Sequence, residues 1–171
     1  MYRIDDETLR EVLTDPAAAA ERVAELAQPP LDDQPGPVGE RISLLRMLGR
    51  LDEAEALGRH ALSLAAKGSR RAVAASLRLA HVLQWQGRFD EADDRFTRAL
   101  ADATRLGDDT LLAFAHQHYG KSLFDQGRAA AAAEQFGAAL RLREAVDAPA
   151  DQLASSRQAI DAARSRRPTI G

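Results

Sequence analysis

Three side chains near the middle of the chain could form a binding surface. Arg78, His81 and Trp85 are separated by three and four residues, within a segment whose apolar pattern predicts a helix. Residues at positions i, i+3 and i+7 lie on one helix face. A guanidinium forms charge-assisted bonds with carboxylates, and an indole supplies a large contact area. The pattern favours a peptide-binding face; the alternative is a solvated arginine and a tryptophan that packs at a helix end.

Histidine can also bind metal, but the spacing here argues against a metal site. His116 and His118 are two residues apart, so on a helix they point to different faces. Neither an HExxH motif nor a cysteine–histidine cluster accompanies them. We therefore expect packed or hydrogen-bonded histidines, with no metal and no cofactor.

The sequence carries no catalytic signature. It has no GxSxG motif, no Walker loop and no dinucleotide fingerprint. Two acidic pairs, at 90–91 and 108–109, stand at predicted helix starts, where carboxylates cap free amides and offset the helix dipole. Acid–base catalysis would need such carboxylates in a shielded cleft. We expect a protein that is not an enzyme.

Composition narrows the class of partner and the compartment. The net charge of −3 gives no basic face of the kind that nucleic acids require. The absence of cysteine excludes disulfides and thiolate metal sites and is compatible with a reducing cytoplasm. Acidic residues near the start have the wrong charge for a signal peptide, and no apolar run approaches the ~20 residues that span a bilayer. We expect a cytoplasmic protein that binds neither nucleic acid nor membrane.

The periodicity of apolar residues predicts helices along almost the whole chain. From Val38 onward these residues recur every three or four positions, without a sustained alternation of the strand type. Glycine just past a helix end accepts a left-handed backbone. The expected breaks are Gly49, Gly68, Gly87, Gly107, Gly127 and Pro149. The predicted helices are 38–48, 51–67, 70–86, 89–106, 110–126, 129–146 and 150–166.

The N-terminal part predicts a separate helical hairpin over 5–27. A short helix is expected to end near Leu13, and Asp15 followed by Pro16 is typical of an N-cap and first turn of a second helix. The proline-rich stretch 28–37 then separates this hairpin from the rest. The hairpin could cap the stack or form a degenerate repeat.

Three segments of the chain repeat one another. Each begins with Gly-Arg, and Ala54, Ala92 and Ala132 follow at matching positions, 38 and 40 residues apart. Phe96 and Phe136 come four residues after the second and third alanine. The glycine closes a tight turn, the alanine lets two helices approach, and the phenylalanine fills the space between hairpins. A lone hairpin cannot bury both faces, so such hairpins must stack.

These segments resemble the tetratricopeptide repeat family, which has a small residue in the first helix of each pair and a small residue, an aromatic and an alanine in the second. The third copy matches best, with Gly120, Ala132, Phe136 and Ala139, whereas Gly58 replaces the aromatic in the first. The period exceeds the usual 34 residues. It is similar to that of the subgroup with extended helices found in the kinesin light chain and in bacterial regulatory proteins.

The resemblance implies an all-α fold, a right-handed superhelical stack of antiparallel helix pairs with about eight or nine helices. One domain would cover 1–171. Its parts would be the N-terminal hairpin at 5–27, repeats at 38–67, 70–106 and 110–146, and a capping helix at 150–166. The capping helix would bury a thin apolar stripe and turn the following residues to water: Arg157, Asp161, Arg164, Arg166 and Arg167.

In that family the first helices of each pair line a concave groove that binds peptides. The matching positions are Ser43, Arg46, Arg78, His81, Gln84, Trp85, Gln117, His118, Lys121 and Phe124. This mixture of cations and aromatics suits a protein or peptide that is acidic or carries aromatic residues. The resemblance does not extend to the clamp that some relatives use for chaperone tails, because Gly39 and Phe114 stand at two of its positions. We expect a non-catalytic scaffold.

Two other functions are compatible with the sequence. The chain could be a structural or self-association module, in which the alanine-rich face 129–133 or the terminal hairpins pair with a second copy to form a homodimer or another homo-oligomer. It could also be a regulatory sensor of a small peptide in the same groove.

Overall fold

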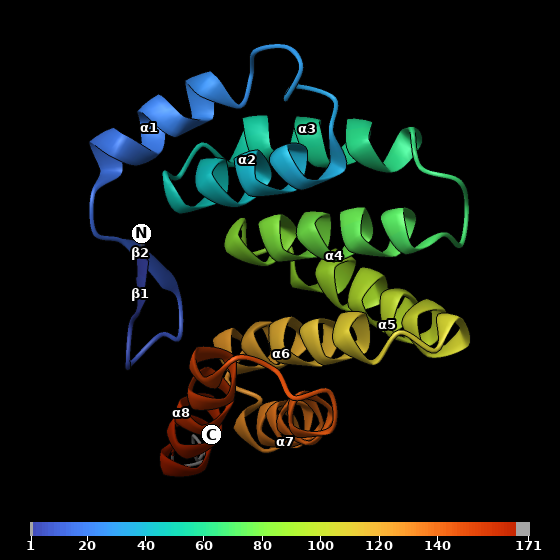
Figure 1. The fold of residues 1–171 in the computed structure, drawn as a ribbon. Coiled ribbons are helices and arrows are strands. Elements are labelled where there is room, and N and C mark those ends of the chain that lie inside the picture. The colour runs from blue at the N-terminus through green and yellow to red at the C-terminus, as the bar shows by residue number, and fades with distance from the viewer. Residues whose placement is uncertain (1, 167–171) are drawn as a thin grey trace. The chain divides into compact units, whose positions relative to one another are not determined.

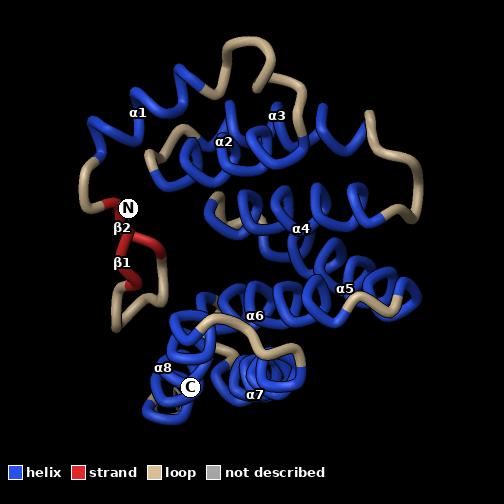
Figure 2. Tube along the Cα trace, in the orientation of Figure 1, coloured by secondary structure: helices blue, strands red, loops and turns tan. Residues whose placement is uncertain are grey.

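The computed structural model describes residues 2–166, which form eight α-helices and one short β-hairpin (Figures 1 and 2). The two strands, β1 (Tyr2–Ile4) and β2 (Glu11–Leu13), pair with each other. The helices are α1 (Pro16–Glu25), α2 (Pro35–Met47), α3 (Leu51–Ser63), α4 (Arg70–Trp85), α5 (Phe89–Leu106), α6 (Asp109–Asp125), α7 (Ala129–Ala145) and α8 (Ala150–Ser165). The predicted all-α stack of helices is confirmed.

The chain divides into two compact units. Unit 1 contains Met1–Arg3 and Glu11–Arg95, and unit 2 contains Ile4–Arg10 and Phe96–Gly171. The division falls inside α5, so that unit 1 holds α1 to α4 and unit 2 holds α6 to α8. The organisation of 1–171 as one domain remains a prediction.

The prediction of a helix that ends near Leu13 is wrong, because residues 2–13 form the β-hairpin. Asp5 closes its turn: one carboxylate oxygen accepts from the Thr8 amide at 2.9 Å and from the Thr8 hydroxyl at 2.8 Å. The Asp5 amide donates to the Arg10 carbonyl at 2.9 Å, and Leu9 has a φ of 57°. An aspartate that bonds nearby amides competes with helix formation, and the chain turns instead.

Helix boundaries follow the predicted signals closely. The five glycines predicted as breaks all have positive φ, including 75° at Gly87 and 76° at Gly127. Two boundaries differ from the prediction by more than one residue. Helix α2 begins at Pro35 rather than at 38, because proline in the first turn already has a helical φ and lacks only an amide that would be unpaired there. Helix α3 ends at Ser63, before the predicted 67.

The core of unit 1 lies among α1 to α4. Small residues on α3, namely Ala54, Gly58 and Ala61, are buried. A Cβ added to Gly58 would be 3.4 Å from a methyl group of Leu79, so the two helices already pack at contact distance. The apolar cluster around this contact contains Val23, Val38, Ile42, Leu45, Ala54, Ala61, Ala75 and Val82.

The core of unit 2 is built around α7, which packs against both α6 and α8. Phe136 is fully buried and lies against Gly120 of α6. The hairpin residue Leu9 belongs to the same apolar cluster as Leu123 and Phe124. The predicted repeat positions therefore pack in the third copy as the pattern indicated.

Helix α8 closes unit 2 through Ala159 and Ala163, which are buried. Arg157, Asp161 and Arg164 are exposed, as predicted. Arg166 is also exposed, but its guanidinium lies 3.8 Å above the Phe124 ring. The expectation for Arg167 lies outside the described residues. Within residues 2–166, no helix combines the length and the hydropathy that crossing a membrane would need.

Glu55 of α3 holds the turn between α4 and α5. Its carboxylate accepts from Gln86 at 2.9 Å, from Arg88 at 2.8 and 2.9 Å, and from Arg59 at 2.6 Å. Burial raises the pKa of Glu55, but these hydrogen bonds from Gln86, Arg59 and Arg88 outweigh it and lower the pKa to about 2. Sequence reasoning missed this interaction because 31 positions separate Glu55 from Gln86.

The Glu55 contacts predict a loss of stability in acid. Because the folded pKa is lowered from 4.5 to about 2, the contribution is complete above pH 4.5 and disappears as the pH falls towards 2. Glu55→Gln should lower the free energy of unfolding by about 1–2 kcal/mol at neutral pH. Melting curves should show this difference shrinking below pH 4.5, whereas the exposed control Glu21→Gln should show none of comparable size. A difference that is constant with pH would contradict the role of the carboxylate.

Two helical glycines should respond differently to a methyl group. At Gly120 an added Cβ would be 2.5 Å from the Phe136 ring, which is fully buried and has no room to move. At Gly39 it would be 2.5 Å from the Arg78 guanidinium, the flexible end of a half-buried side chain. Gly120→Ala should therefore cost about 1–3 kcal/mol by overpacking, while Gly39→Ala should change stability by less than ~1 kcal/mol. Urea unfolding measures both, and equal effects would contradict this account.

Candidate functional site

In unit 1 the predicted groove residues lie on two neighbouring helices. Helices α2 and α4 contact each other directly, although α3 separates them in the sequence. Ser43 and Arg46 come from α2, and the remaining four come from α4: Arg78, His81, Gln84 and Trp85. We call this surface the α2–α4 face. Its two ends carry different chemistry.

One end of the α2–α4 face is a cluster of Arg46, His81 and Trp85. The Arg46 guanidinium lies 4.5 Å from the centre of the Trp85 ring, within the range of a cation–π interaction. The His81 ring meets the same indole edge-on, at 6.5 Å between centroids and 80° between planes. The sequence predicted that His81 and Trp85 share a face, and the structure confirms it.

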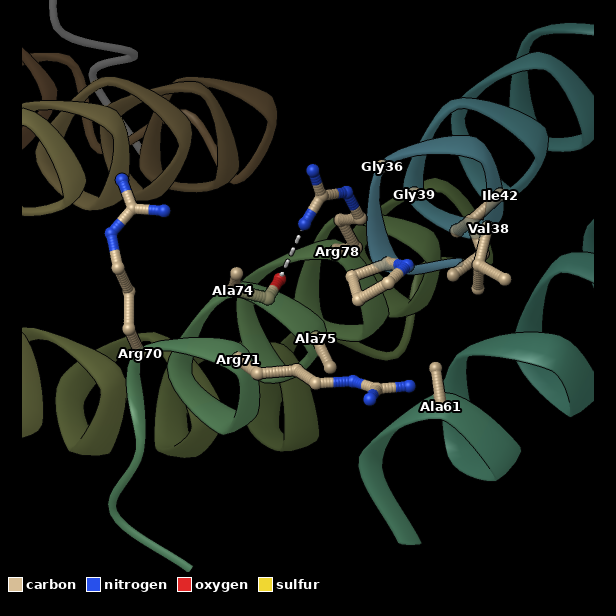
Figure 3. A pocket seen from close by; sticks show the side chains of 11 residues that line it. Gly36, Val38, Gly39, Ile42, Ala61, Arg70, Arg71, Ala74, Ala75 and Arg78 are labelled. Carbon is tan, nitrogen blue, oxygen red and sulfur yellow. Dashed lines mark hydrogen bonds between the residues drawn. The ribbon is translucent and has the colours of Figure 1, made fainter. Parts of the chain in front are cut away.

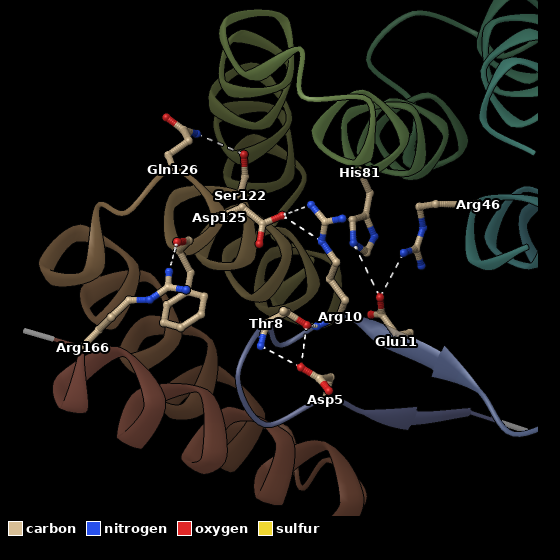
Figure 4. Close-up of polar contacts among 11 residues, drawn as sticks. Asp5, Thr8, Arg10, Glu11, Arg46, His81, Ser122, Asp125, Gln126 and Arg166 are labelled. Carbon is tan, nitrogen blue, oxygen red and sulfur yellow. Dashed lines mark hydrogen bonds and ion pairs between the residues drawn. The ribbon is translucent and has the colours of Figure 1, made fainter. Parts of the chain in front are cut away.

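A carboxylate from the chain itself occupies this cluster. Glu11 of β2 accepts from Nη1 of Arg46 at 3.0 Å, and the same oxygen lies 3.8 Å from Nε2 of His81 (Figure 4). The Glu11 and Arg46 side chains are only 6% and 5% exposed. Buried charges are tolerated when they are paired in this way. An extended segment with an acidic residue therefore already lies on this end of the α2–α4 face.

Sequence reasoning missed Glu11 because it placed the residue in a solvated helix. The available signal was weak. Residues 9–13 read apolar, polar, polar, apolar, apolar, which is not the strict alternation that predicts a strand. A buried glutamate would also not be expected in an apolar core.

The other end of the α2–α4 face is an open pocket of about 390 Å³ at the first turns of both helices (Figure 3). Its lining residues are Pro35, Gly36, Val38, Gly39, Ile42, Ala61, Arg70, Arg71, Ala74, Ala75 and Arg78. Arg78 donates to the carbonyl of Ala74 at 3.2 Å. Burial lowers the pKa of Arg78, and the charge of Arg70 lowers it further. Because three arginines line it, the pocket is positively charged, and its floor is apolar.

Ser43 and Gln84 are less available than the sequence suggested. The Ser43 hydroxyl donates to the Gly39 carbonyl of its own helix at 3.1 Å. Gln84 is 1% exposed. Of the unit 1 residues predicted to contact a peptide, Arg78 is the one that lines the open pocket.

In unit 2, two predicted groove residues contribute to internal packing. Gln117 of α6 accepts from Nη1 of Arg143 at 3.2 Å and from the Ser156 hydroxyl at 2.7 Å, which ties α6 to α7 and α8. Phe124 is 2% exposed and lies beneath Arg166. The repeat pattern did not reveal these contacts because they depend on α8, which lies beyond the repeats.

The other two predicted residues of unit 2 also lie on α6. The His118 ring is 4.1 Å from the Phe114 ring, at 50° between planes, and Lys121 is buried. The neighbouring His116 bonds through Nδ1 to Oε1 of Gln135 at 2.8 Å. A hydrogen-bonded His116 is what the sequence predicted.

The Glu11 contact predicts an unequal response of two glutamates in the same hairpin. Glu11→Gln weakens a buried charge-assisted bond, so it should lower the free energy of unfolding by about 1–3 kcal/mol. Glu7→Gln removes the same charge from an exposed position and should change it by less than ~0.5 kcal/mol. Urea unfolding compares the two variants. Equal losses would show that the Arg46–Glu11 pair does not hold the hairpin.

A protein-family model matches the second half of the repeat array. Residues 70–145 match the model of the tetratricopeptide repeat family, and this stretch begins with α4 and ends with α7. It contains the second and third copies of the repeat. No curated protein matches the chain. The glycine, alanine and phenylalanine positions and the family match together show that residues 70–145 are similar to tetratricopeptide repeats.

Proposed function

We propose that the chain is a non-catalytic scaffold that binds an extended segment of a partner protein on its first-helix surfaces. Tetratricopeptide repeats generally mediate protein–protein interactions and are typically not catalytic. The observation that carries the proposal is Glu11, which lies in an extended strand and is held by Arg46. A partner segment would use the same kind of contact.

The chemistry of the α2–α4 face supports an extended and acidic partner. Arginine and tryptophan are enriched at the energetically important positions of protein interfaces. Here Arg46 is already stacked on Trp85 and holds Glu11, which gives an example of such a contact within the chain. Glu11 occupies one end in the structure, and the pocket beside Arg78 leaves the other end open.

We also propose that the chain resembles the subgroup of the family that has extended helices. Helices α5, α6 and α7 contain 18, 17 and 17 residues. Helices of this length account for copies 38 and 40 residues apart, where the family period is 34. The kinesin light chain and bacterial regulatory proteins are the groups that share this feature in the resemblance.

A self-association module is the second candidate. A hollow of about 550 Å³ in unit 2 is lined by alanines at the start of α7 and by residues near the end of α8. These include Ala129, Ala130, Ala131, Ala133 and Ala163, with arginines at the margin. Such a surface could receive a second copy of the chain.

Selection from a displayed random-peptide library tests the first candidate. Enriched peptides should bind the wild-type chain and lose about tenfold or more in affinity with Arg78→Glu/Trp85→Ala, because that variant removes a cation and an aromatic anchor from the α2–α4 face. The matched control, Arg141→Glu/Leu64→Ala, changes exposed residues outside this face and should keep its affinity.

The same protein and peptides distinguish the peptide-binding scaffold from the self-association module. Light scattering over a range of concentrations should give a monomer if the first candidate is right, and a dimer without enriched peptides would favour self-association. Peptides that bind the Arg78→Glu/Trp85→Ala variant as tightly as the wild type would place the binding surface elsewhere.

A further inference from the structure

The hollow between the start of α7 and the end of α8, called here the α7–α8 hollow, combines an aliphatic floor with positive charge. Its floor consists of alanines, four from the first turns of α7 and one, Ala163, from α8. Arg128, Arg164 and Arg166 lie at its margin, and no carboxylate is among the described residues that line it. Its volume of about 550 Å³ lies within the range of small-molecule sites. The α7–α8 hollow therefore has the size of a ligand site and a single sign of charge.

Two of the marginal arginines have no carboxylate partner within residues 2–166. The guanidinium of Arg164 is exposed and makes neither an ion pair nor a hydrogen bond there, whereas Arg157, one helix face away, pairs with Glu144 at 3.1 Å. Arg166 donates to the carbonyl of Phe124 and lies 3.8 Å from the centre of its ring. These contacts hold the Arg166 side chain in place but leave its charge uncompensated. Guanidinium groups bind carboxylates and phosphates through strong charge-assisted hydrogen bonds.

The first turn of α7 adds further positive character to the same hollow. Helix α7 has no acidic residue in this turn and no side-chain cap at Arg128, whereas the start of α6 is capped by Asp108, which accepts from the Leu111 amide at 2.8 Å. The first amides of a helix lack partners within the helix and lie at the positive end of its dipole. Residues 129–131 of this turn line the hollow. An anion in the hollow would therefore offset both the arginine charges and the helix dipole.

The lining of the α7–α8 hollow disfavours ligands that need many hydrogen bonds. Apart from the arginines and Gly127, its described lining residues are alanines. No aromatic ring is among them to stack on a nucleobase, and neither alanine nor arginine side chains offer an acceptor for a base, a ribose or a peptide amide. An alkyl chain needs no acceptor, because it gains stability only by leaving water. The lining therefore favours a ligand with an anionic head and an aliphatic body.

A second copy of the chain matches the α7–α8 hollow less well than a small anion does. In a two-fold dimer, the same surface of each copy meets its counterpart. A contact centred on the hollow would bring Arg128, Arg164 and Arg166 towards the same three arginines of the other copy. Like charges that face each other across an interface oppose binding. Charge complementarity therefore favours an anionic occupant.

We propose that the α7–α8 hollow binds one free single-chain anionic amphiphile, such as a medium-chain fatty acid or an alkyl phosphate. The head group binds Arg164, Arg166 and the first turn of α7, and the alkyl chain lies on the alanine floor. The occupant is a free molecule and not a bilayer, because a bilayer would need an extended apolar helix face and this hollow is bounded by two helix ends. The proposal goes beyond the peptide-binding function and does not depend on it, because every lining residue belongs to unit 2.

Isothermal titration calorimetry on the full chain tests the proposal, with all ligands below their micellar concentrations. The ligands are octanoate, decanoate, octyl phosphate, the uncharged 1-octanol and inorganic phosphate. Octanoate, decanoate and octyl phosphate should bind with one molecule per chain. Decanoate should bind about 4-fold to 15-fold more tightly than octanoate, because two further methylene groups leave water. 1-Octanol should bind about 10-fold more weakly than octanoate, because it lacks the charge that the arginines receive.

Two pairs of matched variants locate the site, and all four positions are exposed, so the fold should tolerate each change. Arg164→Gln should weaken decanoate about 5-fold to 10-fold and leave 1-octanol within about twofold, because it removes only charge. Its control, Arg141→Gln, removes an exposed cation outside the hollow. Ala130→Leu fills part of the floor and should weaken decanoate and 1-octanol alike, by about 10-fold. Its control, Ala145→Leu, adds the same side chain elsewhere on α7, and both controls should stay within about twofold of the wild type.

Several distinguishable results would overturn the proposal. If 1-octanol binds as tightly as octanoate, or Arg164→Gln keeps its affinity for decanoate, the arginines do not select an anion. If inorganic phosphate binds as tightly as octyl phosphate, the alanine floor plays no part. Binding to phosphatidylglycerol vesicles without binding to the free amphiphiles would assign the surface to a membrane. A dimer that Ala130→Leu dissociates would assign it to a second copy. Absence of binding by every ligand would also contradict the proposal, whatever the outcome of the peptide selection.

Discussion

Close contact between neighbouring helices determines which side chains of this protein are available. In unit 2, Gly120 of α6 lies against the buried ring of Phe136, and in unit 1, Gly58 of α3 packs against Leu79. Larger residues at these glycines would separate the helices. In unit 1 the side of α2 and α4 that faces Glu11 carries the polar residues Arg46 and His81.

Polar groups on that side are buried enough to require partners. Arg46 of unit 1 is 4% exposed, and a buried charge without a partner would cost several kcal/mol. Glu11 meets this requirement from within the chain. A partner protein does not need to displace Glu11 if it binds at the other end of the α2–α4 face. The two ends therefore differ in role: one holds the N-terminal strand and the other remains open.

The extent to which the sequence predicted the structure depends on the range of the interactions. Helices and their glycine breaks depend on local periodicity and backbone freedom, so they were predicted within a few residues. The β-hairpin depends on Asp5 capturing the Thr8 amide and on Glu11 reaching Arg46, 35 positions away. Gln117 was assigned to the groove by its place in the repeat, but it bonds to Arg143 and Ser156. Local pattern does not report such distant pairs.

Charge pairing elsewhere in the chain gives the Arg78 pocket its significance. Arg22, Arg50 and Arg88 each bond a nearby glutamate, and those bonds raise the pKa of each guanidinium. The pKa of Arg78 is instead lowered, by burial and by the charge of Arg70. In a chain with a net charge of −3, carboxylates are plentiful, yet none lines this pocket. An arrangement that leaves a positioned cation beside an apolar floor is unfavourable for the isolated chain, and an acidic group bound there would make it more favourable.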